Sequence, residues 1–77
     1  MIVYAIKSKR GYVSRRRPYP TVCPTLHGLS IRDFYKSKEN AEKHIAPIAD
    51  YIDRYFHNLI DAFDKMKVVP IEMKEAR

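Results

Sequence analysis

The sequence predicts one α+β domain, a small antiparallel sheet of three or four strands packed against a helix that is broken or kinked at Pro47. Two observations support this fold class. Short runs of β-branched and aromatic residues occur near both ends of the chain, and apolar residues at helical spacing fill the stretch between them. The length of 77 residues allows a single domain, and a hydrophobic content of 45% is high enough for a folded chain.

The first predicted element is a hairpin over residues 2–14. Residues 2–6 are rich in β-branched and aromatic side chains, as strands usually are. Lys9 and Arg10 precede Gly11, which tolerates the positive φ that tight turns require. Residues 12–14 are then expected to form the returning strand.

Residues 15–28 are predicted to form a basic, proline-rich loop. Pro18, Pro20 and Pro24 each remove a donor from a sheet ladder, and each restricts the residue before it. An apolar pattern resumes at Leu29, so we expect a third short strand near residues 32–36.

A long helical pattern follows Ser37, which is a favourable N-cap residue. Apolar residues recur in steps of three or four, at Ala41, Ile45, Ile48, Ile52, Phe56, Leu59, Phe63 and Met66. One helix over this stretch would be about 44 Å long, whereas a five-residue strand spans about 17 Å. We therefore expect two helical segments, 38–46 and 48–66, with a bend at Pro47. The alternative is a straight helix whose overhang is buried against another molecule.

The closing strand is expected over residues 68–73. Because proline cannot donate to a ladder, Pro70 places this strand at a sheet edge or at a position whose N–H is not needed.

Three segments resemble small uncharacterised accessory proteins of tailed bacteriophages. They are the opening strand with Gly11-Tyr12-Val13, the Phe34–Lys43 segment with its Ser-Lys-Glu-x-Ala-Glu helix start, and the closing Val68–Glu72. The resemblance covers about half of the chain. It implies an architecture and a phage origin, and some members of this class bind and disable host proteins. It transfers no functional residue.

The net charge of +6 is concentrated in the first half of the chain. Residues 1–36 contain eight Lys and Arg residues and a single acid, Asp33, whereas residues 37–77 contain seven bases and eight acids. This asymmetry predicts that one side of the molecule faces an acidic partner.

The predicted partner-binding residues come from the hairpin, the basic loop and the following segment. They are Lys9, Arg10, Tyr12, Arg15, Arg16, Arg17, Tyr19 and Arg32. Arginine and tyrosine are frequent anchors at protein interfaces, and they also bind phosphates and stack on bases. An acidic surface on a host protein, a nucleic acid and plain solvation of the loop are all compatible with this set.

A second candidate surface lies on the predicted helix. Tyr51 and Tyr55 flank its apolar stripe, where they either border the core or form an exposed rim that Ile60 would widen. Such a rim would serve a partner or a second copy of the chain, which leaves a homodimer as an open alternative.

No pattern in the sequence predicts catalysis, a cofactor or a metal site. The three histidines are scattered, Cys23 is the only cysteine, and the chain has only two glycines and no phosphate-binding loop. A single cysteine in so small a domain favours a reducing cytoplasm, and no apolar stretch approaches the length of a membrane span. We therefore expect a non-enzymatic protein of the host cytoplasm that binds and inhibits or modulates a host protein. Direct DNA or RNA binding and a homo-oligomeric structural role are the alternatives.

Overall fold

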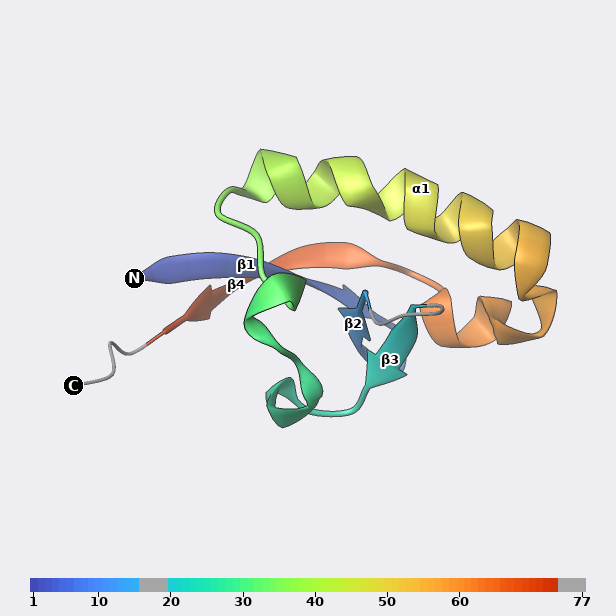
Figure 1. Cartoon of the computed structure of the whole chain (residues 1–77), viewed down its shortest axis with the longest axis horizontal. Helices are drawn as coiled ribbons and strands as arrows, with labels where there is room; N and C mark the ends of the chain where they lie inside the picture. The colour runs from blue at the N-terminus through green and yellow to red at the C-terminus, as the bar shows by residue number, and fades with distance from the viewer. Residues whose placement is uncertain (16–19, 74–77) are drawn as a thin grey trace.

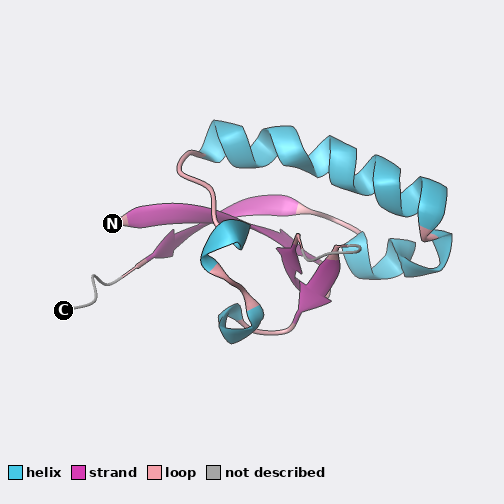
Figure 2. Cartoon of the chain, viewed as in Figure 1, coloured by secondary structure: helices cyan, strands magenta, loops and turns pink. Residues whose placement is uncertain are grey.

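The computed structural model describes residues 1–15 and 20–73 and confirms the α+β class. Four antiparallel strands form one sheet in the order β3-β2-β1-β4, and one long helix lies across it (Figures 1 and 2). The elements are β1 (Ile2–Ser8), β2 (Gly11–Ser14), β3 (Thr21–Cys23), α1 (Lys38–Tyr55) and β4 (Lys67–Glu72), with short 3₁₀ helices η1 (Leu26–Gly28), η2 (Ile31–Asp33) and η3 (His57–Phe63).

The predicted hairpin is formed by β1 and β2, which pair antiparallel through Lys7 with Tyr12 and Ser8 with Gly11. Glycine is needed at position 11 for two reasons. Its φ is +156°, and a Cβ at this position would collide with the backbone carbonyl of Cys23 on β3. The close packing of β3 against the hairpin therefore depends on Gly11.

The fourth strand is not the one that the sequence predicts. Part of the expected 15–28 loop forms β3, and the expected strand near residues 32–36 is replaced by η2 and one isolated bridge between Tyr4 and Tyr35. The cause is local hydrogen bonding, because Ser30 and Asp33 form a capping box that closes the chain into a 3₁₀ turn. Only Tyr35 remains extended enough to pair with β1.

The predicted break at Pro47 is wrong, because α1 runs through Pro47 without interruption. Pro47 lies on the exposed side of the helix, where water can bond to the carbonyl that its missing N–H leaves without a partner. The helix ends at Tyr55 instead of residue 66. Phe56 leaves the helical conformation with φ −135° and ψ 51°, and residues 57–63 form η3. An α1 of 18 residues is about 27 Å long, which reduces the expected overhang.

The main core lies between the sheet and α1. Its buried members are Ile6, Val13, Tyr35, Ala41, Ile48, Ile52 and Phe63. Tyr4 packs against this cluster and Ala5 does not, so the even-numbered residues Tyr4 and Ile6 point toward α1. Ile2, at the start of β1, is 58% exposed and lies outside this core.

The position of Pro70 in β4 agrees with the sequence prediction for this edge. β4 is an outer strand, and Pro70 is opposite Tyr4 of β1. Both backbone groups of Tyr4 bond to Tyr35, with distances of 2.9 and 2.8 Å, and therefore point away from β4. The missing N–H of Pro70 consequently lies on the open side of the sheet, where it removes a donor from the exposed edge.

Candidate partner-binding face

The predicted basic residues form two separate groups at the two ends of β2. Lys9 and Arg10 occupy the turn before this strand, and Arg15 directly follows its last residue. Four strand residues separate the groups by roughly 13 Å. The sequence treats them as one set, whereas the fold gives them different surroundings.

The first group, Lys9 and Arg10, is paired with an acid from η3. Arg10 donates from Nη2 and Nε to Asp61 Oδ2 over 2.6 and 3.1 Å, and Lys9 Nζ lies 3.5 Å from Asp61 Oδ1. The hydrogen bond from Arg10 and the positive charge of Lys9 lower the pKa of the Asp61 carboxyl below its ordinary value. All three side chains are exposed, so the pairing adds little stability, but it offsets part of the local positive charge.

The second group is built around Arg15. Its guanidinium donates to the carbonyl oxygen of Arg32 over 2.7 Å and lies 4.9 Å from the centre of the Tyr35 ring. Its backbone N–H donates to Asp33 Oδ1 over 2.8 Å. These contacts hold Arg15 and Arg32 side by side although 17 positions separate them in the sequence.

Asp33 organises this end of β2 from inside the protein. It is 3% exposed, and its Oδ2 accepts hydrogen bonds from the Ser14 hydroxyl at 3.0 Å and from the Ser30 backbone N–H at 2.9 Å. Burial alone would raise the pKa of the Asp33 carboxyl. The hydrogen bonds from Ser30, Arg15 and Ser14 outweigh burial, so this pKa lies below its ordinary value. Asp33 is therefore a buried carboxylate that serves the fold.

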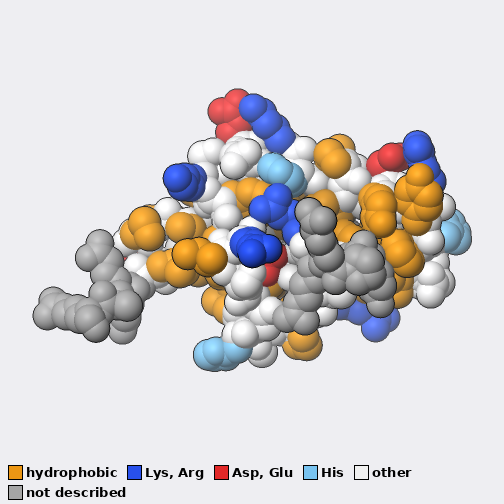
Figure 3. Space-filling model, in the orientation of Figure 1, with side chains coloured by type: hydrophobic (Ala, Val, Ile, Leu, Met, Phe, Trp, Pro, Cys, Tyr) orange, Lys and Arg blue, Asp and Glu red, His pale blue; other side chains and the backbone are white. Residues whose placement is uncertain are grey.

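The arginines around Asp33 keep their positive charge available. In the described parts of the chain, no ion pair involves Arg15, Arg32 or Lys36. Asp33 is also the only acid between residues 15 and 38. Figure 3 shows Lys and Arg side chains gathered at the centre of this side of the molecule, with a His side chain beside them.

The tyrosines differ in their availability. Tyr12 is half-buried, with Lys7 Nζ 5.5 Å from its ring centre, and Tyr35 is 4% exposed, so burial limits both rings as stacking platforms. Burial also raises the pKa of the Tyr35 hydroxyl. The ring of His44 on α1 also packs against the Tyr35 ring, and the two ring centres are 4.9 Å apart.

Tyr51 and Tyr55 lie on the same flank of α1 as His44. Positions 44, 51 and 55 are seven and four residues apart, which places them along one side of a helix. The rings of Tyr51 and Tyr55 are 5.1 Å apart, and the two residues are 36% and 64% exposed. His44 contacts Tyr35, and Tyr35 contacts Arg15, so the His44 end of this flank adjoins the Arg15 group. Tyr51 and Tyr55 follow on the same flank, about 10 and 16 Å further along the helix axis. We call Arg15, Arg32, His44, Tyr51 and Tyr55 the basic–aromatic face.

The remaining predicted residues do not join this face. Ile60 belongs to η3 and lines a pocket with Ile45 and Asp53, on the opposite flank of α1. Arg16, Arg17 and Tyr19 were predicted to bind a partner and lie outside the described residues.

The sequence analysis did not predict the structural role of Asp33 or the exposure of Ile31. Asp33 was counted only as an acid, although its spacing from Ser30 is that of a capping box and was a readable signal. Ile31 belongs to the apolar pattern that precedes the expected 32–36 strand, but it is 82% exposed in η2, and no sequence signal distinguishes it from a core isoleucine.

In the described residues, no group of three or more His, Cys, Asp or Glu side chains is placed to hold a metal ion. Cys23 is buried, with its Sγ 3.5 Å from the carbonyl oxygen of Gly28. What the basic–aromatic face can do is bind: it presents guanidinium groups beside exposed aromatic rings.

Comparisons of the chain with protein-family models, curated proteins and solved structures found no match. Within the part of the chain that the structure describes, no helix has the length and apolar content needed to cross a lipid bilayer.

Proposed function

We propose that this chain is a non-enzymatic binding protein that uses the basic–aromatic face to occupy an acidic surface on a host protein and thereby inhibits or modulates that protein. In this proposal it acts in the host cytoplasm as a phage accessory protein, of the kind that its strand and helix-start segments resemble. The observation that carries the proposal is the contrast in ion pairing between Arg15–Arg32 and Lys9–Arg10.

Two features of the face support a protein partner over a nucleic acid. Arg and Tyr are the residue types most enriched among interface anchors, and Tyr55 is the most exposed tyrosine of the face. Base stacking calls for open rings beside the basic groups, whereas the ring that contacts Arg15, Tyr35, is buried, and the open rings of Tyr51 and Tyr55 lie further along α1. Nucleic-acid binding is therefore the outcome against which the proposal is tested.

The test compares three forms of the protein in cross-linking capture from bacterial lysate at near-physiological salt. They are the wild type, R15A/R32A, and the charge-matched control K43A/K67A, whose lysines are exposed on α1 and β4. We expect the wild type and the control to capture the same host protein and R15A/R32A to lose at least about 90% of it, because two unpaired interface charges are removed.

Nuclease treatment of the lysate separates the two partner classes. Capture that persists after nuclease supports the protein partner. Capture that disappears with nuclease, or that R15A/R32A retains in full, contradicts the proposal.

A further inference from the structure

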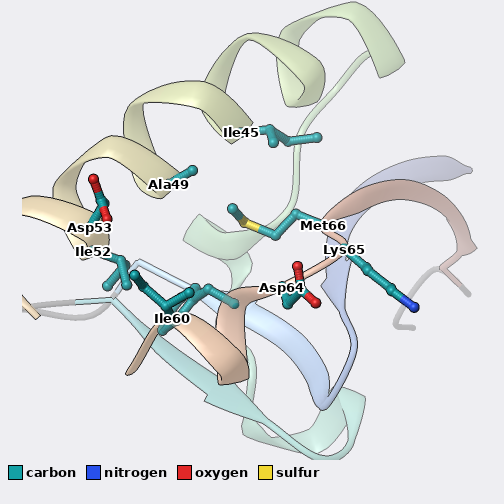
Figure 4. A pocket seen from close by; sticks show the side chains of 9 residues that line it. Ile45, Ala49, Ile52, Asp53, Ile60, Asp64, Lys65 and Met66 are labelled. Atoms are coloured by element: carbon teal, nitrogen blue, oxygen red, sulfur yellow. The ribbon is translucent and has the colours of Figure 1, made fainter. Parts of the chain in front are cut away.

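A pocket of about 330 Å³ opens between the C-terminal half of α1 and η3 (Figure 4). Its apolar lining comes from Ile45, Ala49, Ile52, Ile60, Phe63 and Met66. Ile52 and Phe63 are 1% and 5% exposed, so they belong to the rigid core. The volume lies at the lower end of the range for ligand pockets, which suits a single apolar side chain with its neighbours.

The charged residues at this pocket favour a positively charged occupant. Asp53 comes from α1, and Asp64 and Lys65 come from the turn before β4. In Figure 4 the amino group of Lys65 extends away from the apolar lining. Asp53 Oδ1 also lies 3.4 Å from Nδ1 of the exposed His57. The two carboxylates therefore give the pocket a negative rim.

The same chain carries a group that complements this pocket. Ile31 is 82% exposed, the highest value among the large apolar side chains of the described residues. It is followed by Arg32, and the Arg15 guanidinium is bonded to the Arg32 carbonyl. An isoleucine beside two arginines matches an apolar pocket beside two aspartates.

We propose that Ile31 of one copy inserts into the α1–η3 pocket of a second copy, with Arg15 and Arg32 facing Asp53 and Asp64. Ile31 is exposed on its own molecule and lies outside its own pocket, so the contact joins two copies. The two surfaces differ, so one such contact leaves a free pocket on the inserting copy and a free Ile31 on the receiving copy. These either join further copies head-to-tail or contact each other in a closed two-fold dimer. This inference uses the same two arginines as the proposed function, but the pocket with Asp53 and Asp64 takes no part in that function, so either can fail without the other.

Sedimentation equilibrium of the purified protein from about 10 μM to about 1 mM tests the association, a range chosen because small interfaces bind weakly. We expect the average mass of the wild type to rise with concentration. Ile31→Asp should weaken association by about tenfold or more, because it removes the buried apolar group and adds a like charge to the acidic rim. Ile2→Asp changes another exposed apolar side chain, on β1 and outside both the pocket and the basic–aromatic face, and is the control that should leave association unchanged.

A mixture of two variants tests whether the contact joins Ile31 of one copy to the pocket of the other. Ile31→Asp lacks the inserting side chain, and Ala49→Phe fills the pocket from an exposed helix position. Each variant alone should remain monomeric, and the mixture should form a 1:1 heterodimer that grows no further, because one intact contact is left. Circular dichroism checks folding, and Asp53→Lys replaces Ala49→Phe if the latter is unfolded.

The remaining outcomes overturn the proposal. They are a wild type that stays monomeric at about 1 mM, an Ile31→Asp variant that associates like the wild type, and two variants that do not associate when mixed although the wild type does. A small-molecule or foreign-protein occupant of the pocket would give the first of these results.

Discussion

The two ends of β2 carry similar basic residues but hold them by different means. At the Gly11 end, the β1–β2 turn is bound to η3: Ser8 Oγ donates to the Ala62 carbonyl over 2.6 Å, the Lys9 N–H donates to the Asp64 carbonyl over 2.8 Å, and Arg10 pairs with Asp61. At the Ser14 end, a buried carboxylate holds the backbone, and the arginine side chains have no acidic partner among the described residues.

The comparison shows that a count of charges in a sequence does not measure how much charge a surface offers. Arg10 and Arg15 are five positions apart, and each donates a hydrogen bond from its guanidinium. Arg10 donates to a carboxylate, which offsets its charge, whereas Arg15 donates to a neutral carbonyl. The guanidinium of Arg15 is therefore the one that forms no ion pair with a carboxylate in the described residues.

The largest expected effect on stability comes from Gly11→Ala, which disturbs the backbone at the Gly11 end of β2. The new Cβ would collide with the Cys23 carbonyl at a φ of +156°. We expect a loss of about 3 kcal/mol or more in the free energy of unfolding, measured by urea denaturation. Arg10→Ala, one position earlier and exposed, should unfold close to the wild type. An unchanged midpoint for Gly11→Ala would show that β3 can move away from the hairpin.

Asp33→Asn changes the Ser14 end of β2. It should lower the free energy of unfolding by about 2 kcal/mol, because it weakens a buried acceptor of several hydrogen bonds. Asp61→Asn makes the same chemical change at the exposed end and is the matched control, for which we expect little change in the urea midpoint. Equal effects at the two sites would remove the contrast between the two ends.

The contribution of Asp33 to the free energy of unfolding also depends on pH, and the direction of this dependence follows from its lowered pKa. Its pKa in the folded protein is below its unfolded value of about 3.9. The stability from the ionised carboxylate is therefore fully present above about pH 5 and is lost as the pH falls through the folded pKa. The stability gap between wild type and Asp33→Asn should narrow in acid, and a gap that is constant from neutral pH to about pH 2 would contradict a lowered pKa.

Removing charges in pairs compares the two groups directly, with short duplex DNA as a simple polyanion. If Arg15 and Arg32 each neutralise a phosphate, R15A/R32A should reduce the log–log salt slope of binding by about 1.8. K9A/R10A removes the same formal charge but should reduce the slope by less than about 0.9, because Asp61 already offsets part of it. Equal reductions would mean that the Asp61 pairing does not hold in solution.

The smallest expected effect is a change in one titration. Arg10→Ala removes the hydrogen bond that lowers the pKa of Asp61, so this pKa should rise toward its ordinary value. Carboxyl NMR chemical shifts followed against pH measure it. Asp33 in the same variant serves as the internal control, and its titration should not move.

The sequence predicted the elements that have strong local signals. Gly11 marked the hairpin turn, Ser37 marked the start of α1, and Pro70 marked an edge strand. The end of α1 could not be predicted in this way, because Phe56, Leu59 and Phe63 continue the helical spacing after the helix has ended. β3 has three residues, and its pairing with β2 defines it better than any pattern of its own.

The candidate site was predicted by composition but not by arrangement. Arg15 and Arg32 were both selected, and their proximity follows from the buried Asp33, which links segments far apart in the chain. The exposure of Ile31 follows from the 3₁₀ turn that Asp33 also stabilises. Long-range hydrogen bonds of this kind leave no periodic trace in a sequence.

The ladder between β1 and β4 has a consequence for the order of folding. It joins residues 2–7 with residues 67–72, the most distant segments among the strand pairs of the sheet. Closing so long a chain loop is slow because the entropy must be lost before the contacts form. During synthesis β1 emerges before β4, so Ala5 and Ile6 have no β4 strand beside them until residues 67–72 have been made. Before β4 is available, β1, β2, β3 and α1 can form, but the β4 edge of β1 is unpaired and is exposed to chaperones and to aggregation.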